Sequence, residues 1–274
     1  MSELKYLDIS EFQLDITDVK KLVSNCDGVM VRVGFTGYGS MSPTLDQRFD
    51  RFMEALIKED IPVGVYYFTL GYNESIIDKE INFLFSQLKR YEDRGYRFKL
   101  PIAVDCEAQQ NCIPWTNLTA ERRSELMDYW CKKVKEAGYY PIIYAGVRGY
   151  HRTPYWLIKG MLTEWDKWTA QYYTVCQWDG VAGADYHIWQ YASDGDGKAH
   201  GLASSRVDMN KSYVDYAKVI TDGYYNHIEK PIIVTPDTNS TCNCANCNKS
   251  KLKVTIGNDI VVIDRDTKVT IECF

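Results

Sequence analysis

The chain of 274 residues is 45% hydrophobic and 25% charged, which suffices for one large domain, or for one domain with a small appendage. Its net charge of −5, without a basic run or a basic stripe, argues against a nucleic-acid partner. No apolar stretch approaches about 18 residues, so no membrane span is expected. The N-terminus lacks the apolar segment of a signal peptide, and we therefore expect a product made as a cytosolic protein.

The first part of the chain alternates strand patterns with amphipathic helix patterns. Strands are expected at residues 5–10, 28–35, 61–70, 100–107 and 140–146. Helices are expected between them at residues 15–25, 45–58, 75–91 and 119–137. The later elements are a weaker helix at 155–163, short strands at 167–172, 186–191 and 206–210, and a closing helix at 211–220.

Eight strands, of which the first five alternate with helices, predict an α/β fold with a parallel sheet. Closure of that sheet gives an irregular TIM-like (β/α)5(β)3 barrel. We assign residues 1–225 to this barrel, 226–240 to a linker, and 241–274 to a small cysteine-containing β module. Strands in the module are expected at 252–256, 260–263 and 268–271, and such a unit is too short to hold a core unaided.

The expected fourth strand, Leu-Pro-Ile-Ala-Val-Asp-Cys-Glu, begins apolar and ends in two acids, Asp105 and Glu107. Side chains two residues apart on a strand share one face, which places these two Cα atoms about 6.6 Å apart. Like charges at this spacing separate the two pKa values, so that one group donates a proton and the other stays an anion. The pair therefore predicts general acid/base chemistry on a polar substrate.

Two further acids, Asp8 and Asp208, fall near the ends of the first and the eighth strand. In a barrel the carboxyl ends of the strands carry the active site, and the first and eighth strands are neighbours. Four acids at one mouth could hold a divalent cation, but no histidine stands in coordinating spacing. Aromatic residues on the same strands favour a carbohydrate instead, and the candidates for the walls of its site are Tyr66, Phe68, Tyr144, Trp168, Tyr172 and Trp189.

The nine cysteines do not form the pattern of a disulfide framework. Cys106, between the two acids, is expected to point to the opposite face of its strand and to fill the core. Four other cysteines gather in the C-terminal module, namely Cys242, Cys244, Cys247 and Cys273. They are candidates for a structural zinc site, for disulfides formed after release, or for pairing between chains in a homo-oligomer.

Several short motifs, in this order, together resemble the glycoside hydrolase family 25 lysozymes, the Chalaropsis-type N-acetylmuramidases common among phage endolysins. They are Tyr-Leu-Asp-Ile-Ser, Gly-Val-Tyr-Tyr-Phe, Val-Asp-Cys-Glu, Trp-Thr-Ala-Gln-Tyr, Ile-Trp-Gln-Tyr and Val-Asp-Met-Asn. The resemblance covers residues 4–220 and implies the same irregular barrel. It also implies hydrolysis of peptidoglycan at the β-1,4 bond from N-acetylmuramic acid to N-acetylglucosamine, without a catalytic cofactor.

By this resemblance Glu107 is the general acid, and Asp105 stays ionised and orients the 2-acetamido group of the substrate. Positioning of a water by Asp105 is the open alternative. Asp8 and Asp208 would tune the electrostatics of the pair and bind sugar hydroxyls. The protein would act on the cell wall after release from the host cytoplasm, or from a phage particle, with the C-terminal module binding the wall or mediating oligomerisation.

Two other interpretations compete with a lysozyme. A family 18 chitinase-type barrel also carries paired acids on its fourth strand, but its motif has further aspartates where this chain has Ile102, Ala103 and Val104. A barrel kept only as a wall-binding or phage-tail structural module would be free to lose its acids, whereas all four are present here.

Overall fold

A computed structural model describes residues 3–108, 112–151, 157–178, 186–230, 233–236, 251–256 and 259–264. The chain divides into two compact units, Met1–Ile228 and Glu229–Phe274. None of the helices in the described ranges is long and apolar enough to cross a membrane.

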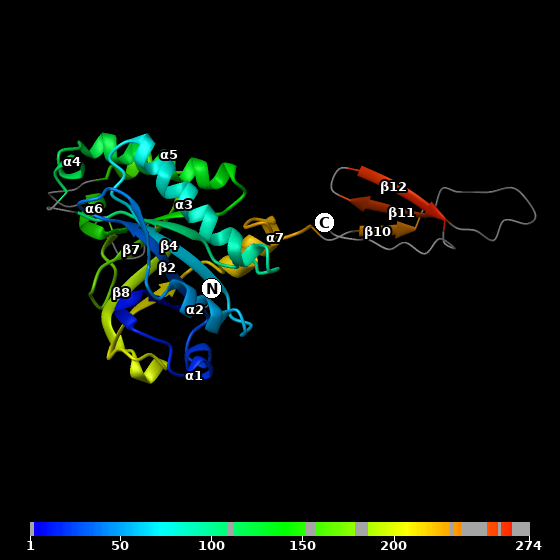
Figure 1. Ribbon diagram of the computed structural model, residues 1–274, viewed down its shortest axis with the longest axis horizontal. Coiled ribbons are helices and arrows are strands. Elements are labelled where there is room, and N and C mark those ends of the chain that lie inside the picture. The colour runs from blue at the N-terminus through cyan, green and yellow to red at the C-terminus, as the bar shows by residue number, and fades with distance from the viewer. Residues whose placement is uncertain are drawn as a thin grey trace, which may run out of the picture. The chain divides into compact units, whose positions relative to one another are not determined.

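The first unit is built around a closed barrel, which confirms the expected fold (Figure 1). Its eight strands are β1 (Leu4–Ile9), β2 (Gly28–Thr36), β4 (Val63–Phe68), β5 (Ile102–Asp105), β6 (Pro141–Gly146), β7 (Asp166–Ala170), β8 (Ile188–Asp196) and β9 (Arg206–Ser212). Each strand pairs with the next in this order, and β1 pairs with both β2 and β9, which closes the ring. A short strand not foreseen from the sequence, β3 (Pro43–Leu45), adds to the edge of β2 as a hairpin.

The last strand of the barrel runs against the expected direction. β9 is antiparallel to both β8 and β1, because β8 turns directly into β9 with Asp196 opposite Arg206. A hairpin needs only a short connection, whereas a parallel return needs a crossover of a dozen or more residues. β9 therefore enters the barrel from the mouth, and Asp208 lies near its beginning rather than at its end.

Seven α-helices are described, and those between the early strands cover the outside of the barrel (Figure 1). They are α1 (Val19–Ser24), α2 (Phe49–Leu56), α3 (Glu74–Glu92), α4 (Ile113–Thr116), α5 (Ala120–Glu136), α6 (Val147–His151) and α7 (Tyr216–Gly223). Side chains cap several N-termini: Asn73 accepts from the third amide of α3, and Thr119 does so for α5. The closing helix starts at Tyr216, after its cap Asp215, because residues 211 and 212 belong to β9.

Two expectations concern ranges that the structure describes only in part. The helix expected at 155–163 overlaps residues 152–156, which lie outside the described ranges, and a 3-10 turn occupies Lys159–Met161. In the second unit β10 (Ile233–Pro236), β11 (Lys251–Ile256) and β12 (Asp259–Asp264) form an antiparallel sheet. β10 lies inside the stretch expected as a linker, and the strand expected at 268–271 and the four C-terminal cysteines lie outside the described residues.

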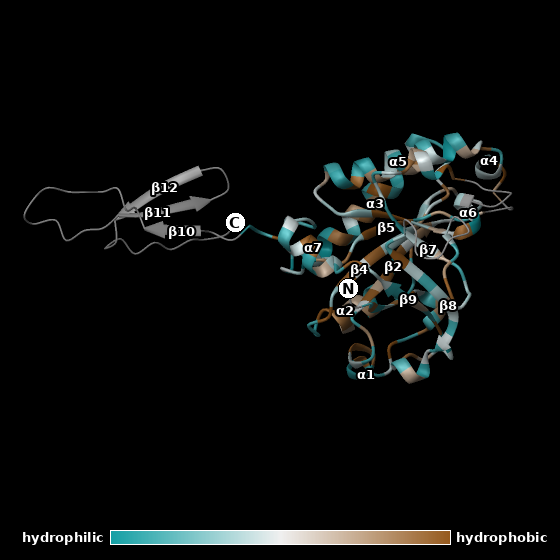
Figure 2. Ribbon diagram, turned by 180° about the vertical axis from the view of Figure 1, so that it is seen from behind, coloured by the Kyte–Doolittle hydropathy of each residue, from teal (hydrophilic) through white to brown (hydrophobic). Residues whose placement is uncertain are grey.

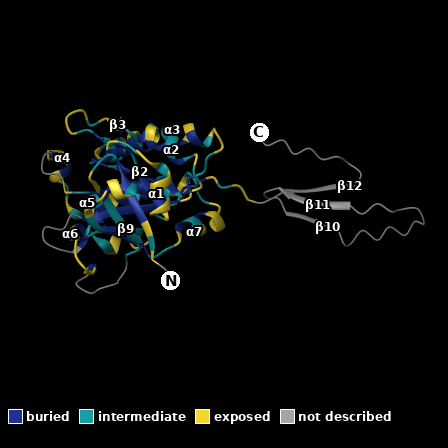
Figure 3. Ribbon diagram, turned by 90° about the horizontal axis from the view of Figure 1, so that it is seen from below, coloured by how far each residue is buried: buried dark blue, intermediate teal, exposed yellow. Residues whose placement is uncertain are grey.

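Alternation along the strands separates two apolar clusters. Outward residues such as Val31 and Val65 pack against the helices, while inward residues such as Met30 and Ile142 fill the barrel. The strands are buried and hydrophobic, whereas the outer helix faces are polar and exposed (Figures 2 and 3). Inside the barrel there is no room at Gly64, where an added Cβ would lie 2.6 Å from that of Leu100.

One buried carboxyl ties α3 to the strand ends. Glu80 accepts hydrogen bonds from the hydroxyls of Thr36 and Thr69 and from the amide of Leu70. Burial raises its pKa to about 7 in spite of these donors. The amide of Thr69 donates in turn to the carbonyl of Asp105 at 3.0 Å, so this anchor fixes the backbone beside the acid pair.

Candidate active site

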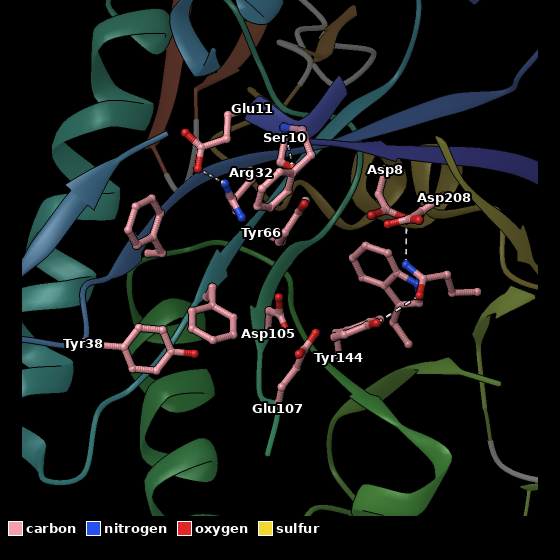
Figure 4. Close-up of a pocket in the computed structure, with 15 residues that line it drawn as sticks. Asp8, Ser10, Glu11, Arg32, Tyr38, Tyr66, Asp105, Glu107, Tyr144 and Asp208 are labelled. Atoms are coloured by element: carbon pink, nitrogen blue, oxygen red, sulfur yellow. Dashed lines mark hydrogen bonds and ion pairs between the residues drawn. The ribbon is translucent and has the colours of Figure 1, made fainter. Parts of the chain in front are cut away.

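At the mouth of the barrel the inward positions change from apolar to polar, and they line a cavity of about 410 Å³ (Figure 4). The change follows the strand period of two: on β1, Tyr6 lies in the interior cluster and Asp8 lies above it. The residues that line the cavity are Asp8, Ser10, Glu11, Phe12, Arg32, Phe35, Tyr38, Tyr66, Phe68, Asp105, Glu107, Tyr144, Trp168, Gln190 and Asp208. All four acids predicted from the sequence are therefore brought together.

Asp8 and Asp208 stand opposite each other on the paired strands β1 and β9. Their carboxyls share a hydrogen bond, and the two groups lie side by side in Figure 4. Burial, the charge of Asp8 and this bond raise the pKa of Asp208 to about 8. Burial raises the pKa of Asp8 as well, but its hydrogen bonds to Asn210, Gln190 and Asp208 oppose that shift. We therefore assign the shared proton to Asp208, with Asp8 as the acceptor.

Asp8 is held as the acceptor by two side-chain amides. Its Oδ2 accepts from Asn210 Nδ2 at 2.7 Å and from Gln190 Nε2 at 3.0 Å. Both amides are themselves oriented, because Trp168 Nε1 donates to Asn210 Oδ1 and the Tyr144 hydroxyl donates to Gln190 Oε1. Donors on the carbonyl oxygens leave the NH2 groups to face Asp8, and neither Asp8 nor Asp208 has a buried oxygen without a partner in the described structure.

Among the described residues, no side-chain amide donates to Asp105 or Glu107 in this way. Asp105 is the last residue of β5 and is 7% exposed, yet its Oδ1 is buried and has no hydrogen-bond partner within the described structure. Burial and the nearby charges of Glu107 and Asp8 raise its pKa well above the usual range, and Arg32 opposes this shift. Burial and Asp8 also raise the pKa of Glu107. Both groups are thus shifted in the same direction, rather than apart as the spacing alone predicted.

Arg32 is the cation of the cavity. It occupies an inward position of β2, next to a bulge at Val33 that shifts the pairing with β4. Its Nε donates to Asp46 at 2.7 Å and its Nη2 to Glu11 at 2.9 Å. The guanidinium carbon lies 5.2 Å from the ring centroid of Phe12, so the group is fixed by charge and by ring contact.

Aromatic side chains form the floor of the cavity. Trp168 packs edge-on against Tyr66, with ring centroids 5.9 Å apart, and against Tyr144, with centroids 4.9 Å apart. Phe68 also lines the cavity. These four predicted wall residues lie where the sequence placed them, and flat apolar faces of this kind suit a pyranose ring.

The other two predicted wall residues lie elsewhere. Tyr172 lines a neighbouring cavity and reaches the site only through its hydroxyl, which donates to Gln190 at 2.9 Å. Trp189 lies on the outer face of β8, because Ile188 and Gln190 take the inward positions. It packs in the outer core and donates to the carbonyl of Gln171, so it is a structural residue.

Sequence reasoning missed three polar residues of this site: Arg32, Gln190 and Asn210. Arg32 and Gln190 have a signal in the sequence, since each is a polar residue at an inward position of an apolar stretch of strand. Asn210 has none, because β9 is polar along most of its length. Cys106 has the outward position that was predicted and is buried in the outer core. Within the described ranges no three His, Cys, Asp or Glu residues are grouped so as to hold a metal ion.

A pair of buried carboxyls at the mouth of a β/α barrel, above an aromatic floor, is the equipment of a glycoside hydrolase. The sequence also matches the family model for glycosyl hydrolases family 25 over residues 7–200, and the chain belongs to this family. No curated protein matches the chain.

Solved structures show the same fold. The autolysin LytC from Streptococcus pneumoniae aligns with a TM-score of 0.63 and 24% identity, over 77% of this chain and 47% of its own. The spore cortex lytic enzyme SleM from Clostridium perfringens aligns with a TM-score of 0.67 and 16% identity, over 97% of this chain and 85% of its own. The catalytic domain of endolysin ply40 from a Listeria monocytogenes bacteriophage aligns with a TM-score of 0.59 and 21% identity, over 80% and 97%. This chain thus spans about half the length of the autolysin.

Proposed function

We propose that this protein is a lysozyme that hydrolyses bacterial peptidoglycan at the β-1,4 bond from N-acetylmuramic acid to N-acetylglucosamine. Family membership supports a glycoside hydrolase, and LytC has also been solved in complex with a synthetic peptidoglycan ligand. The observation that carries the proposal is that the buried Oδ1 of Asp105, beside Glu107 in a cavity of sugar-sized volume, has no hydrogen-bond partner among the described residues.

In this proposal Glu107 is the general acid. Its raised pKa favours the protonated carboxyl, which is the state that donates a proton to the leaving glycosidic oxygen. The same carboxyl, once deprotonated, can accept a proton from the water that completes hydrolysis.

Asp105 would acquire its missing donor from the substrate. An N–H from the 2-acetamido group, directed at Oδ1, would favour the anion and lower the pKa that burial has raised. The anion would then orient the acetamido oxygen for attack on the anomeric carbon, as in substrate-assisted glycosidases. The alternative role, positioning a water for direct attack, inverts the anomeric configuration, whereas acetamido assistance retains it.

Asp8 and Asp208 would determine the electrostatic environment of Asp105 and Glu107. The anion at Asp8 raises the pKa of both Asp105 and Glu107, and the proton on Asp208 is available to a sugar hydroxyl. Tyr66, Tyr144 and Trp168 would contact the faces of the sugar.

The proposed setting is the bacterial cell wall. We propose synthesis in a host cytoplasm and action on the wall after release, as for an endolysin, or from a phage particle. The second unit would bind the wall or mediate oligomerisation, and its four cysteines stay candidates for a structural zinc site. Zinc analysis of the reduced, folded protein tests the proposed zinc site. A content below about one zinc ion per chain would refute it.

Digestion of purified peptidoglycan tests the main proposal. Wild type is expected to release new reducing ends on muramic acid, and Glu107→Gln almost none. Reducing ends on glucosamine, or unimpaired activity of the variant, would overturn the assignment.

A further inference from the structure

A second cavity adjoins the acid-lined one and shares Glu107 and Tyr144 with it. Its volume is about 530 Å³, and its remaining walls come from the last residues of β6 and β7 and from the segments after β5, β6 and β7. In Figure 4 Glu107 and Tyr144 lie at the side of the acid-lined cavity that is away from Arg32 and Glu11. The second cavity therefore begins where the first one ends, with the proton donor on the boundary.

The position of Glu107 determines which part of a substrate meets which cavity. A general acid contacts the glycosidic oxygen, so the scissile bond lies at the boundary between the two spaces. The sugar whose anomeric carbon reacts must face Asp105, in the acid-lined cavity. The leaving sugar is then directed into the second cavity.

The side chains of the second cavity differ in kind from those of the first. Tyr172 and Tyr173 are 54% and 55% exposed, and the hydroxyl bond of Tyr172 to Gln190 holds its ring in place. Arg148, on α6, is exposed at the same cavity and forms no hydrogen bond or ion pair with any described residue. An unpaired guanidinium beside open aromatic faces is suited to a sugar that carries an anionic substituent.

Resting on the function proposed above, we propose that the second cavity binds the leaving-group side of the glycan strand. In this site Tyr173 contacts the sugars. The leaving N-acetylglucosamine is neutral, and Arg148 binds a carboxylate of the stem peptide on the muramic acid that follows it. Peptide-bearing strands are therefore better substrates than strands that are stripped of peptide and then amidated at the lactyl carboxylate that stripping exposes, because only the former present a carboxylate to the guanidinium.

Two substrates distinguish the proposed role of Arg148 from that of Tyr173. One substrate is glycan strands with stem peptides; the other is the same strands after removal of the peptides by an amidase and amidation of the lactyl carboxylates thus exposed. Both are digested, and kcat/KM is measured from released reducing ends. Wild type is expected to prefer the peptide-bearing strand by about fivefold, and less so at high salt. Arg148→Gln abolishes this preference by slowing cleavage of the peptide-bearing strand alone, whereas Arg148→Lys keeps most of it.

Tyr173→Ala is expected to slow cleavage of both substrates by about fivefold, because its ring contacts sugar rather than peptide. Arg51→Gln, an exposed arginine of α2 that lines neither cavity, is the matched control and leaves both rates unchanged. Activity of Arg148→Gln on stripped strands verifies that the variant is folded.

Three results would overturn the inference: wild type without a preference, an equal or absent effect of Arg148→Gln on both substrates, or an inert Tyr173→Ala. A wild type that cleaves neither strand would instead refute the function itself.

Discussion

Two pairs of acids face each other across the mouth of the barrel, and they differ in their hydrogen-bond partners. Asp8 and Asp208 share a proton, and Asp8 also accepts bonds from two oriented amides. Asp105 is equally buried, but one of its oxygens has no partner within the described structure. The first pair is complete in the protein alone, whereas the second is complete only when a donor arrives.

This difference indicates how the work of the site is divided. A buried carboxyl without donors is costly, and such a cost is expected where the substrate supplies the missing bond. The satisfied pair keeps a constant charge in place, and the unsatisfied pair changes its charge during reaction. Changes to the two pairs should therefore have different consequences.

The largest effect is expected from Glu107→Gln. Glutamine keeps the size of the side chain but cannot donate a proton to the leaving oxygen, so kcat should fall about a thousandfold. The wild-type rate should also decline as pH rises through the raised pKa of Glu107, because the acid must be protonated. Steady-state rates on peptidoglycan across pH measure both, with exposed Glu121→Gln as the control. A decline at acid pH alone would contradict the role of a proton donor.

Asp105→Asn should lower kcat about a hundredfold, because the neutral amide cannot stabilise the charge that develops on the acetamido group. The anomeric configuration of the first product, followed by NMR, should be retained in the wild-type reaction. Inversion would instead show that Asp105 positions a water.

Gln190→Ala removes one of the two amide donors to Asp8 and the acceptor of the Tyr144 hydroxyl. We expect kcat to fall about tenfold and the free energy of unfolding to drop by about 1–3 kcal/mol, because buried polar groups lose their partners. Denaturant titration and kinetics check the two values, with exposed Gln47→Ala as the control. An unchanged stability would mean that the satisfied pair does not depend on its donors.

Glu80→Gln should alter stability much more than activity, because glutamine keeps one of the two oxygens that accept bonds in this anchor. The pKa of Glu80 is raised from 4.5 to about 7, so the folded state binds this proton more tightly than the unfolded chain. Its contribution is present below pH 4.5 and is lost as pH rises to about 7, by about 3 kcal/mol. The variant mimics the protonated form, so the wild-type minus variant stability should fall across this window. A flat difference would contradict the raised pKa.

Much of the mouth could be predicted because strand periodicity is a local property. Asp105 and Glu107 are predicted to share one face because they are two residues apart on a strand. The apolar run before them predicts that the strand is buried. Asp208 was placed correctly for an incorrect reason: as the end of a parallel strand, whereas it is near the start of an antiparallel one. Strand direction depends on the length and course of the connection, which apolar patterning does not report.

The errors and omissions at the site have a common physical origin. Trp189 was assigned inward without knowing the register of β8, and a shift of one residue exchanges the two faces. The Tyr144 hydroxyl orients the amide of Gln190, and the indole of Trp168 orients that of Asn210. In both cases the two partners come from strands that are distant in sequence. Such a network exists only once the barrel has closed, so no single segment of sequence contains it.

The closure of the barrel through β9 has a consequence for synthesis. Asp8 leaves the ribosome early, but Asn210, its donor, follows 202 positions later. A nascent chain that has not yet delivered β9 has neither the paired acid nor the oriented amide, and its ring is open. Contacts of such long range form late in folding. Chains that stop before β9 are consequently expected to be inactive, because the site can assemble only after residue 212 has been synthesised.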